Sequence, residues 1–231
     1  MANWITRILD FISPRSCVVC GRRLSPNERS LCSVCLLHLP RTTYQFTPTD
    51  NLMDQLFWGQ LSVERAAALM FYEPHSEMAQ LVYQLKYGQR PDIGEDMGRL
   101  MAREMSLGDF FNGIDALVPV PLTRKRHRQR GYNQSEMLAR GISDVTGIPV
   151  ITEAVCREHF QQSQTSLSRR ERQENVEGVF VLRHPQLLES KHILLIDDIC
   201  TTGATLMACG KVLHNIERVS ISMLTLGFTK K

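Results

Sequence analysis

A chain of 231 residues with 43% hydrophobic and 22% charged residues has an ordinary globular composition, with enough apolar material for a core. The formal net charge of +3 is too small to imply a polyanionic partner by itself. No apolar run approaches the roughly 20 residues that cross a bilayer, so we expect no membrane span. The expected location is the cytoplasm, where cysteines stay reduced.

The first 14 residues carry apolar side chains at helical spacing, with Arg7 and Asp10 on the other side. This pattern predicts a short amphipathic helix that docks on the body of the protein. A helix that lies on a membrane surface is the alternative.

Two C-x2-C pairs follow, and they consist of Cys17, Cys20, Cys32 and Cys35. Each pair directs two sulfurs to one point, so two pairs predict a tetrahedral four-thiolate zinc site. Four thiolates leave no open position, and we therefore expect one structural zinc per chain. Two disulfides or four unrelated thiols are the alternatives. A unit as small as residues 1–45 has too little core to fold without the metal.

The polar stretch 41–51 predicts a linker, and residues 52–231 then form the second unit. Apolar patterns predict strands at residues 66–72, 114–120, 179–182, 193–196 and 219–226. Apolar spacing predicts helices at residues 78–88, 93–105, 134–146 and 205–213. Strands that alternate with helices indicate an α/β domain with a parallel sheet flanked by helices.

The expected strand 193–196 runs directly into Asp197 and Asp198. Ligands collect at the carboxyl ends of strands in open α/β sheets. Two adjacent carboxylates there can accept hydrogen bonds from two vicinal hydroxyls, as on a ribose. The small residues that follow let backbone N–H groups converge on a phosphate at a helix start. An ordinary strand, acidic turn and helix is the alternative. The predicted phosphoribosyl site consists of Asp197, Asp198, Thr201, Thr202, Gly203, Ala204 and Thr205.

Five of the seven residues from Arg124 to Arg130 are Arg or Lys, and they follow the expected strand 114–120. We interpret this run as a loop on the ligand side of the sheet that stabilises a pyrophosphate group. Arg130 is favoured because it adjoins a glycine and a helix start. A solvated surface loop and a nucleic-acid-binding loop are alternatives, although Tyr132 is the sole aromatic close by in the sequence. The candidate pyrophosphate ligands are Arg124, Lys125, Arg126 and Arg130.

A second polar stretch, residues 157–178, contains four arginines. A surface helix is one reading, with Ser168 and Glu171 able to cap it. A loop that closes over a ligand is the other reading. The four arginines are Arg157, Arg169, Arg170 and Arg172.

The order of these motifs resembles the ComF family of bacterial competence proteins over almost the whole chain. The segments that carry the resemblance are the four cysteines and residues 85–88, 118–121, 130–134, 164–168 and 197–205, with Arg172 and Asn175. The resemblance implies a small zinc knuckle joined to a phosphoribosyltransferase-like domain. It also implies handling of incoming single-stranded DNA during natural transformation, beside a competence helicase.

Residues 193–205 resemble the signature of type I phosphoribosyltransferases, with Cys200 where an aliphatic residue is usual. The resemblance implies that Asp197 and Asp198 hold the ribose hydroxyls and that residues 201–205 hold the 5-phosphate. It further implies a magnesium ion that arrives with phosphoribosyl pyrophosphate, and a loop between two antiparallel strands that closes over the ligand. It does not separate a catalytic transferase from a nucleotide sensor or an adaptor. No base-binding element is recognised between Tyr44 and Gln60.

Overall fold

The computed structural model describes residues 15–158 and 179–230. The predicted N-terminal helix lies outside the described residues, as does the polar stretch that contains Arg169, Arg170 and Arg172. Within the described ranges, no helix combines the length and the apolar character that crossing a bilayer requires.

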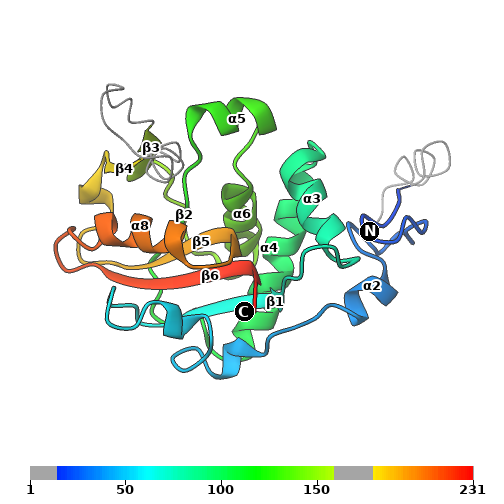
Figure 1. Ribbon diagram of the computed structural model, residues 1–231, viewed down its shortest axis with the longest axis horizontal. Helices are drawn as coiled ribbons and strands as arrows, with labels where there is room; N and C mark the ends of the chain where they lie inside the picture. Colours follow the sequence, from blue (N-terminus) through cyan, green and yellow to red (C-terminus); the bar gives the residue numbers. More distant parts are fainter. Residues whose placement is uncertain (1–14, 159–178, 231) are drawn as a thin grey trace, which may run out of the picture.

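Four strands form a parallel sheet in the spatial order β1-β6-β5-β2 (Figure 1). Their bounds are Ala66–Phe71 for β1, Ala116–Pro119 for β2, His192–Cys200 for β5 and Ser220–Phe228 for β6. The strands are buried almost throughout, as a parallel sheet between helices requires. The predicted parallel α/β sheet is therefore confirmed.

β5 is longer than the apolar run at residues 193–196 predicted. Its pairing with β6 continues past Asp197, which lies opposite Thr225, as far as Cys200. The acidic pair therefore belongs to the last part of the strand and does not lie in the loop after it. Backbone pairing with β6 on both sides of Asp198 consequently fixes the backbone of the acidic pair.

Helices α4 (Pro91–Ser106) and α6 (Gln134–Thr146) cover one face of the sheet, and α8 (Ala204–Leu213) covers the other (Figure 1). The shorter α3 (Ala79–Tyr87) precedes α4. All four helices were predicted from their apolar spacing. Pro91 occupies the first turn of α4, where its missing N–H costs no helical hydrogen bond.

The packing of α4 against α6 depends on two glycines. A Cβ atom added at Gly98 would lie 2.1 Å from the carbonyl oxygen of Leu138. A Cβ atom added at Gly141 would lie 2.0 Å from the carbonyl oxygen of Glu95. Both obstacles are backbone atoms, so a larger side chain would force the two helices apart.

We expect Gly141→Ala to lower the free energy of unfolding by about 1–3 kcal/mol, because the steric cost exceeds the gain in helix propensity. Urea denaturation measures the change. Val145→Ala, at an exposed position of the same helix, should change the free energy by less than about 0.5 kcal/mol. An alanine variant at Gly141 with wild-type stability would show that the close approach is unimportant.

β3 (Val155–Glu158) and β4 (Val179–Leu182) form a separate antiparallel pair on either side of residues 159–178. β4 was predicted. β3 was not, because its residues Arg157 and Glu158 read as the start of a polar segment. The family resemblance implies a loop between two antiparallel strands, and β3 and β4 are such a pair.

Residues 41–51, which their polarity predicts as a linker, pack against β1 in the structure. The Thr42 backbone N–H donates to the Leu69 carbonyl of β1 (3.1 Å), and Asn51 Nδ2 donates to the Ala66 carbonyl of the same strand (2.7 Å). β1 is the edge strand of the sheet, and its free carbonyl groups need partners. The segment therefore covers the sheet edge, and its buried polar side chains are Thr42, Gln45 and Asn51.

Candidate functional site

The carboxyl ends of β2 and β5 border a cavity of about 280 Å³. Val120, just after β2, donates its N–H to the Ile196 carbonyl, and this bond places the segment after β2 beside the acidic pair. The charged side chains that line the cavity are Lys86, Arg126, Arg130, Arg157, Asp197 and Asp198. Four cations against two carboxylates give the cavity a positive balance, which suits an anionic ligand.

Asp197 is held by its neighbours through one carboxylate oxygen. The Ser135 hydroxyl, at the start of α6, donates to Asp197 Oδ1 at 2.9 Å, and the Asp198 N–H donates to the same atom at 2.9 Å. The pKa of Asp197 is raised to about 7. Burial is the larger cause, and the negative charge of Asp198 is the second. A carboxyl group poised near neutral pH is typical of functional sites.

Asp198 forms an ion pair that the sequence did not reveal. Lys86 Nζ, from the last turn of α3, lies 3.2 Å from Asp198 Oδ1, which also accepts the Ile199 N–H at 2.6 Å. Among the described residues, no hydrogen bond is formed to Oδ2 of Asp197 or of Asp198. Each carboxylate therefore keeps one oxygen that can accept a hydrogen bond from a ligand in the cavity.

The threonine-rich loop after β5 leads into α8, which begins at Ala204, one residue before the predicted start. Gly203 adopts a positive φ of 76°, and a Cβ there would lie 3.3 Å from the side chains of Leu56 and Phe57. Residues 201–206 border a second hollow of about 190 Å³, which shares Asp197, Thr201 and Thr205 with the first cavity. Cys200 is buried, and burial raises its thiol pKa to about 12, so it behaves as a packing residue.

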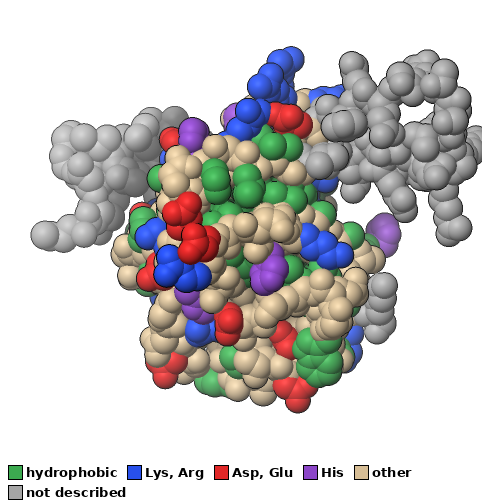
Figure 2. All heavy atoms as spheres, turned by 90° about the vertical axis from the view of Figure 1, so that its left-hand side faces the viewer, with side chains coloured by type: hydrophobic (Ala, Val, Ile, Leu, Met, Phe, Trp, Pro, Cys, Tyr) green, Lys and Arg blue, Asp and Glu red, His purple; other side chains and the backbone are tan. Residues whose placement is uncertain are grey.

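The basic run is a helix, which corrects the predicted loop. α5 (Arg124–Arg130) begins at the Thr123 side chain, which accepts the Arg126 N–H, and ends at Gly131 with a φ of 80°. The run has no apolar face, and helix prediction from periodicity depends on such a face. Arg126 and Arg130 are four residues apart and both line the cavity, whereas Arg124 and Lys125 do not. Lys and Arg side chains project from the top of Figure 2, the end of the molecule where Figure 1 places α5.

Gln134 is a further residue that the sequence did not single out for a role. It lies at the start of α6, is 1% exposed and lines the cavity. Among the described residues, neither its amide nitrogen nor its amide oxygen has a hydrogen-bond partner. A buried amide without partners is costly, so this group is well placed for a ligand that both accepts and donates.

The four cysteines meet as their spacing predicted. Their sulfur atoms all lie within 4.8 Å of one another, and the sulfurs of Cys20 and Cys32 are 3.7 Å apart. Tetrahedral zinc with Zn–S bonds of about 2.3 Å places its sulfurs about 3.8 Å apart, so the cluster fits this metal. All seven cysteines of the chain are free thiols, which excludes the disulfide alternative for this structure. The four candidate ligands are Cys17, Cys20, Cys32 and Cys35.

Local structure explains why the sulfurs converge. Gly21 has a positive φ of 71° and allows the tight turn after the first pair. Cys32 caps the short helix α2 (Ser33–Leu37), and its sulfur accepts the Cys35 N–H. Burial opposes ionisation of Cys17, but backbone N–H groups that donate to its sulfur lower its pKa to about 7. Such N–H donors are also what a metal-bound thiolate needs.

The cysteine segment is fastened to α4 by polar contacts. Ser30 donates its hydroxyl to Asp96 at 2.7 Å, and Arg29 lies 3.3 Å from the same carboxylate. Arg41 bridges to Glu104 at 3.0 Å. None of these contacts involves the cavity at the ends of β2 and β5.

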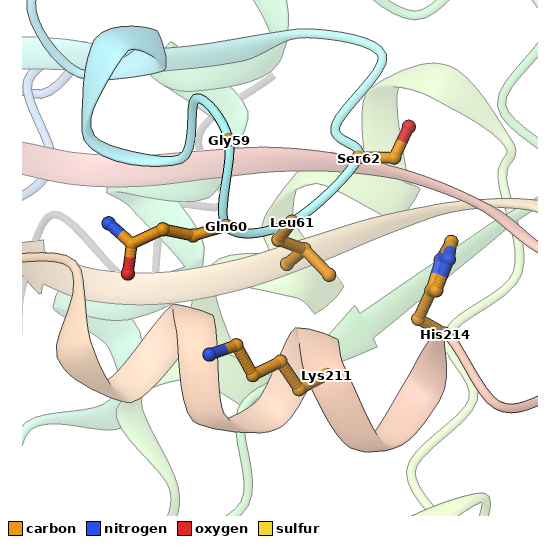
Figure 3. Close-up of a pocket in the computed structure, with 6 residues that line it drawn as sticks. All are labelled: Gly59, Gln60, Leu61, Ser62, Lys211 and His214. Atoms are coloured by element: carbon orange, nitrogen blue, oxygen red, sulfur yellow. The ribbon is translucent and has the colours of Figure 1, made fainter.

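Another cavity, of about 430 Å³, lies between residues 59–62 and the second half of α8 (Figure 3). Lys211 and His214 line it from the helix, and the loop residues from Gly59 to Ser62 line it from the other side. It contains none of the predicted site residues. Leu61, which lines this cavity, packs closely on α8, because a Cβ on Gly210 would meet the Leu61 side chain at 2.5 Å.

Curated relatives now establish the family. DNA utilization protein YhgH of Escherichia coli strain K12 is 30% identical over 200 residues, which cover 85% of this chain and 83% of that protein. The chain belongs to the ComF family. Competence protein F of Haemophilus influenzae is 33% identical over 140 residues, which cover 59% of the ComF chain and 61% of that protein. No protein-family model matches the chain.

A solved structure also resembles this ComF chain at a low level. It is glutamine phosphoribosylpyrophosphate amidotransferase from B. subtilis, complexed with ADP and GMP, with 17% identity and a TM-score of 0.40. The match covers 61% of the ComF chain and 30% of that enzyme. We draw no functional conclusion from it. The parallel sheet, its flanking helices and the four-cysteine cluster confirm the predicted α/β class with a small N-terminal four-cysteine segment.

Proposed function

We propose that this ComF protein binds phosphoribosyl pyrophosphate or a nucleotide in the cavity at the ends of β2 and β5. One observation carries the proposal. Two adjacent carboxylates, each with a free oxygen, face the same cavity as Arg126, Arg130 and the threonine loop. Vicinal hydroxyls beside a phosphate are the groups that this combination recognises.

The parts of the ligand follow from the chemistry of the lining. The ribose hydroxyls donate to Asp197 and Asp198, and the 5-phosphate accepts from residues 201–205 at the start of α8. Arg126 and Arg130 pair with the pyrophosphate, and Gln134 supplies a donor and an acceptor. Magnesium arrives with the pyrophosphate, because this ion keeps most of its waters and needs few protein ligands.

We further propose one structural zinc per chain at the four cysteines, with residues 1–45 as the metal-dependent unit and residues 52–231 as the ligand-binding unit. Four thiolates leave no open coordination position for catalysis. The free thiols of the whole chain suit the reducing cytoplasm, where we place the protein.

The biological role that we propose is DNA uptake during natural competence. Two relatives carry the names competence protein F and DNA utilization protein. A non-catalytic adaptor that binds single-stranded DNA for a competence helicase is the second candidate. It is favoured by α5, whose exposed cations have no carboxylate partner in residues 15–158 and 179–230.

Binding is tested by the double variant Asp197→Asn with Asp198→Asn. Saturating phosphoribosyl pyrophosphate with magnesium should raise the melting temperature of the wild type by about 5–10 °C. The double variant should show no rise, because neutral amides cannot replace both carboxylate acceptors.

The matched control is Asp50→Asn with Asp109→Asn, which removes the same two charges at exposed positions outside the cavity. It should keep the wild-type rise. An equal rise in the Asp197 and Asp198 variant would refute the proposed site. Release of pyrophosphate in the presence of added bases would identify a transferase, and binding without release would identify a sensor.

A further inference from the structure

The last turn of α3 contacts its surroundings through three consecutive residues, and two of them reach the candidate ligand site. Leu85 is fully buried in the core. Lys86 reaches Asp198 at the end of β5, and Tyr87 reaches Arg130 in α5 (Figure 1). Successive side chains of an α-helix point about 100° apart, so one short turn can contact the core, β5 and α5 together.

Leu85 fixes this turn in the fold. Its side chain packs on α4, because a Cβ atom added at Gly94 would lie 3.2 Å from the Leu85 side chain. The Tyr132 hydroxyl donates to the Leu85 carbonyl, and carbonyl groups in the last turn of a helix need partners from outside the helix. The turn is therefore tied both to the core and to the segment between α5 and α6.

Lys86 places a positive charge against the acidic pair. Its Nζ lies 3.2 Å from Asp198 Oδ1, and its side chain is only 24% exposed. Two adjacent carboxylates repel each other, and a cation beside one of them offsets that repulsion. Burial raises the pKa of Asp197, and the positive charge of Lys86 opposes that rise. Lys86 therefore acts on both carboxylates, although it contacts one.

Tyr87 contacts a cation of the basic helix. The centre of the Arg130 guanidinium lies 5.5 Å from the centroid of the Tyr87 ring, which is within the range of a cation–π contact. The Tyr83 ring, one turn earlier in α3, packs on Tyr87 with the ring centroids 5.2 Å apart. An arginine side chain has many rotamers. A ring that restricts Arg130 beforehand reduces the entropy lost when its guanidinium pairs with an anion.

We propose that Lys86 and Tyr87 are positioning residues of the phosphoribosyl site. Lys86 orients Asp198 for the ribose hydroxyls, and Tyr87 orients Arg130 for the pyrophosphate. One turn of α3 thereby sets the spacing between the sugar-binding and the pyrophosphate-binding parts of the cavity. The role toward the ligand rests on the proposed function, whereas the order that the turn imposes on the ligand-free cavity does not.

Calorimetric titration with phosphoribosyl pyrophosphate and with ribose 5-phosphate, which lacks the pyrophosphate, tests Tyr87. Tyr87→Ala should weaken binding of phosphoribosyl pyrophosphate about threefold and leave binding of ribose 5-phosphate unchanged, because only the first ligand uses Arg130. Tyr87→Phe should bind both ligands like the wild type, because a ring remains. Phe46→Ala, which removes another exposed ring, is the matched control and should affect neither ligand.

Lys86 is tested in the ligand-free protein by a carboxyl ¹³C NMR titration of Asp197. Lys86→Met should raise the pKa of Asp197 above its wild-type value of about 7, by at least about half a pH unit, because a charge that opposes protonation is removed. Lys86→Arg should keep the wild-type value, as should Lys211→Met, which removes a lysine outside this cavity. These variants leave the other charged and titratable groups around Asp197 in place, namely Asp198, Arg126, Arg130, Arg157, Cys200 and Cys209.

The Nε–Hε resonance of Arg130 provides a second measurement without ligand. An aromatic ring face shifts nearby protons upfield, so Tyr87→Ala should move this resonance downfield and Tyr87→Phe should not. An unmoved Arg130 resonance in the alanine variant would overturn the proposal, as would an unchanged Asp197 titration in Lys86→Met. Equal losses of affinity for both ligands in Tyr87→Ala would also overturn it. A wild type that binds neither ligand would refute the phosphoribosyl site itself, while the two NMR measurements would still decide whether the turn orders the cavity.

Discussion

Replacing Cys32 with serine is expected to release the zinc and lower the melting temperature by about 10 °C. A four-thiolate site that loses one ligand binds zinc far more weakly, and metal binding supplies folding free energy to small segments. Residues 15–39 contain few buried apolar side chains of their own, chiefly Leu24, Leu31 and Leu39. A loss of roughly 3–5 kcal/mol in a chain of this size corresponds to that shift.

Metal analysis and thermal melting of the same samples measure both effects. Cys156→Ser is the matched control, because Cys156 is only partly buried and lies outside the cluster. It should retain about one zinc per chain. A Cys32→Ser protein with full zinc content and an unchanged melting temperature would disprove the structural role. The thermal response to phosphoribosyl pyrophosphate should persist in any folded variant, because no residue of 15–39 lines that cavity.

The second large effect concerns pH. The pKa of Asp197 is raised to about 7, so below pH 7 the side chain is largely protonated and has lost an acceptor for a ribose hydroxyl. If the ligand binds the ionised form, affinity should rise about tenfold per pH unit up to pH 7 and then level off. Calorimetric titration from pH 5.5 to 8.5, a range chosen around roughly that pKa, measures this.

Asp197→Asn removes the titrating carboxyl group. The pH dependence of affinity that remains then comes from the ligand's own phosphate, whose second pKa is about 6. The same pH slope in the wild type and in the variant would show that Asp197 does not control binding. Protein stability should change in the opposite direction. A raised folded-state pKa means that the stabilisation from protonated Asp197 is present below the unfolded pKa of about 3.9 and is lost as pH rises through about 7.

Features encoded in consecutive residues were predictable. The two C-x2-C turns specify their geometry locally, and the structure brings all four sulfurs together. The run from residue 193 to 205 contains its own strand, acidic pair and helix start, so its order alone predicted its shape. The phosphoribosyl ligand at this run stays a prediction.

Two local predictions failed for identifiable reasons. The basic run reads as a loop because helix prediction depends on an apolar face, and α5 has none. The polarity of residues 41–51 predicts a linker, yet the polar groups of Thr42 and Asn51 form hydrogen bonds with β1. Whether a polar segment is solvated depends on which strand edge lies open beside it, and the local sequence does not contain that information.

The sequence by itself determined the clustering of the four cysteines, the parallel α/β class and the position of the acidic pair at a strand end. Tertiary structure alone decided which distant side chains join that pair. The order β1-β6-β5-β2 places the end of β2 beside Asp197, and the packing of α3 and α6 adds Lys86 and Gln134. The same packing sets Tyr87 beside α5. These contacts join residues 40 or more apart, and such pairs are selected by how helices pack on the sheet, not by any local pattern.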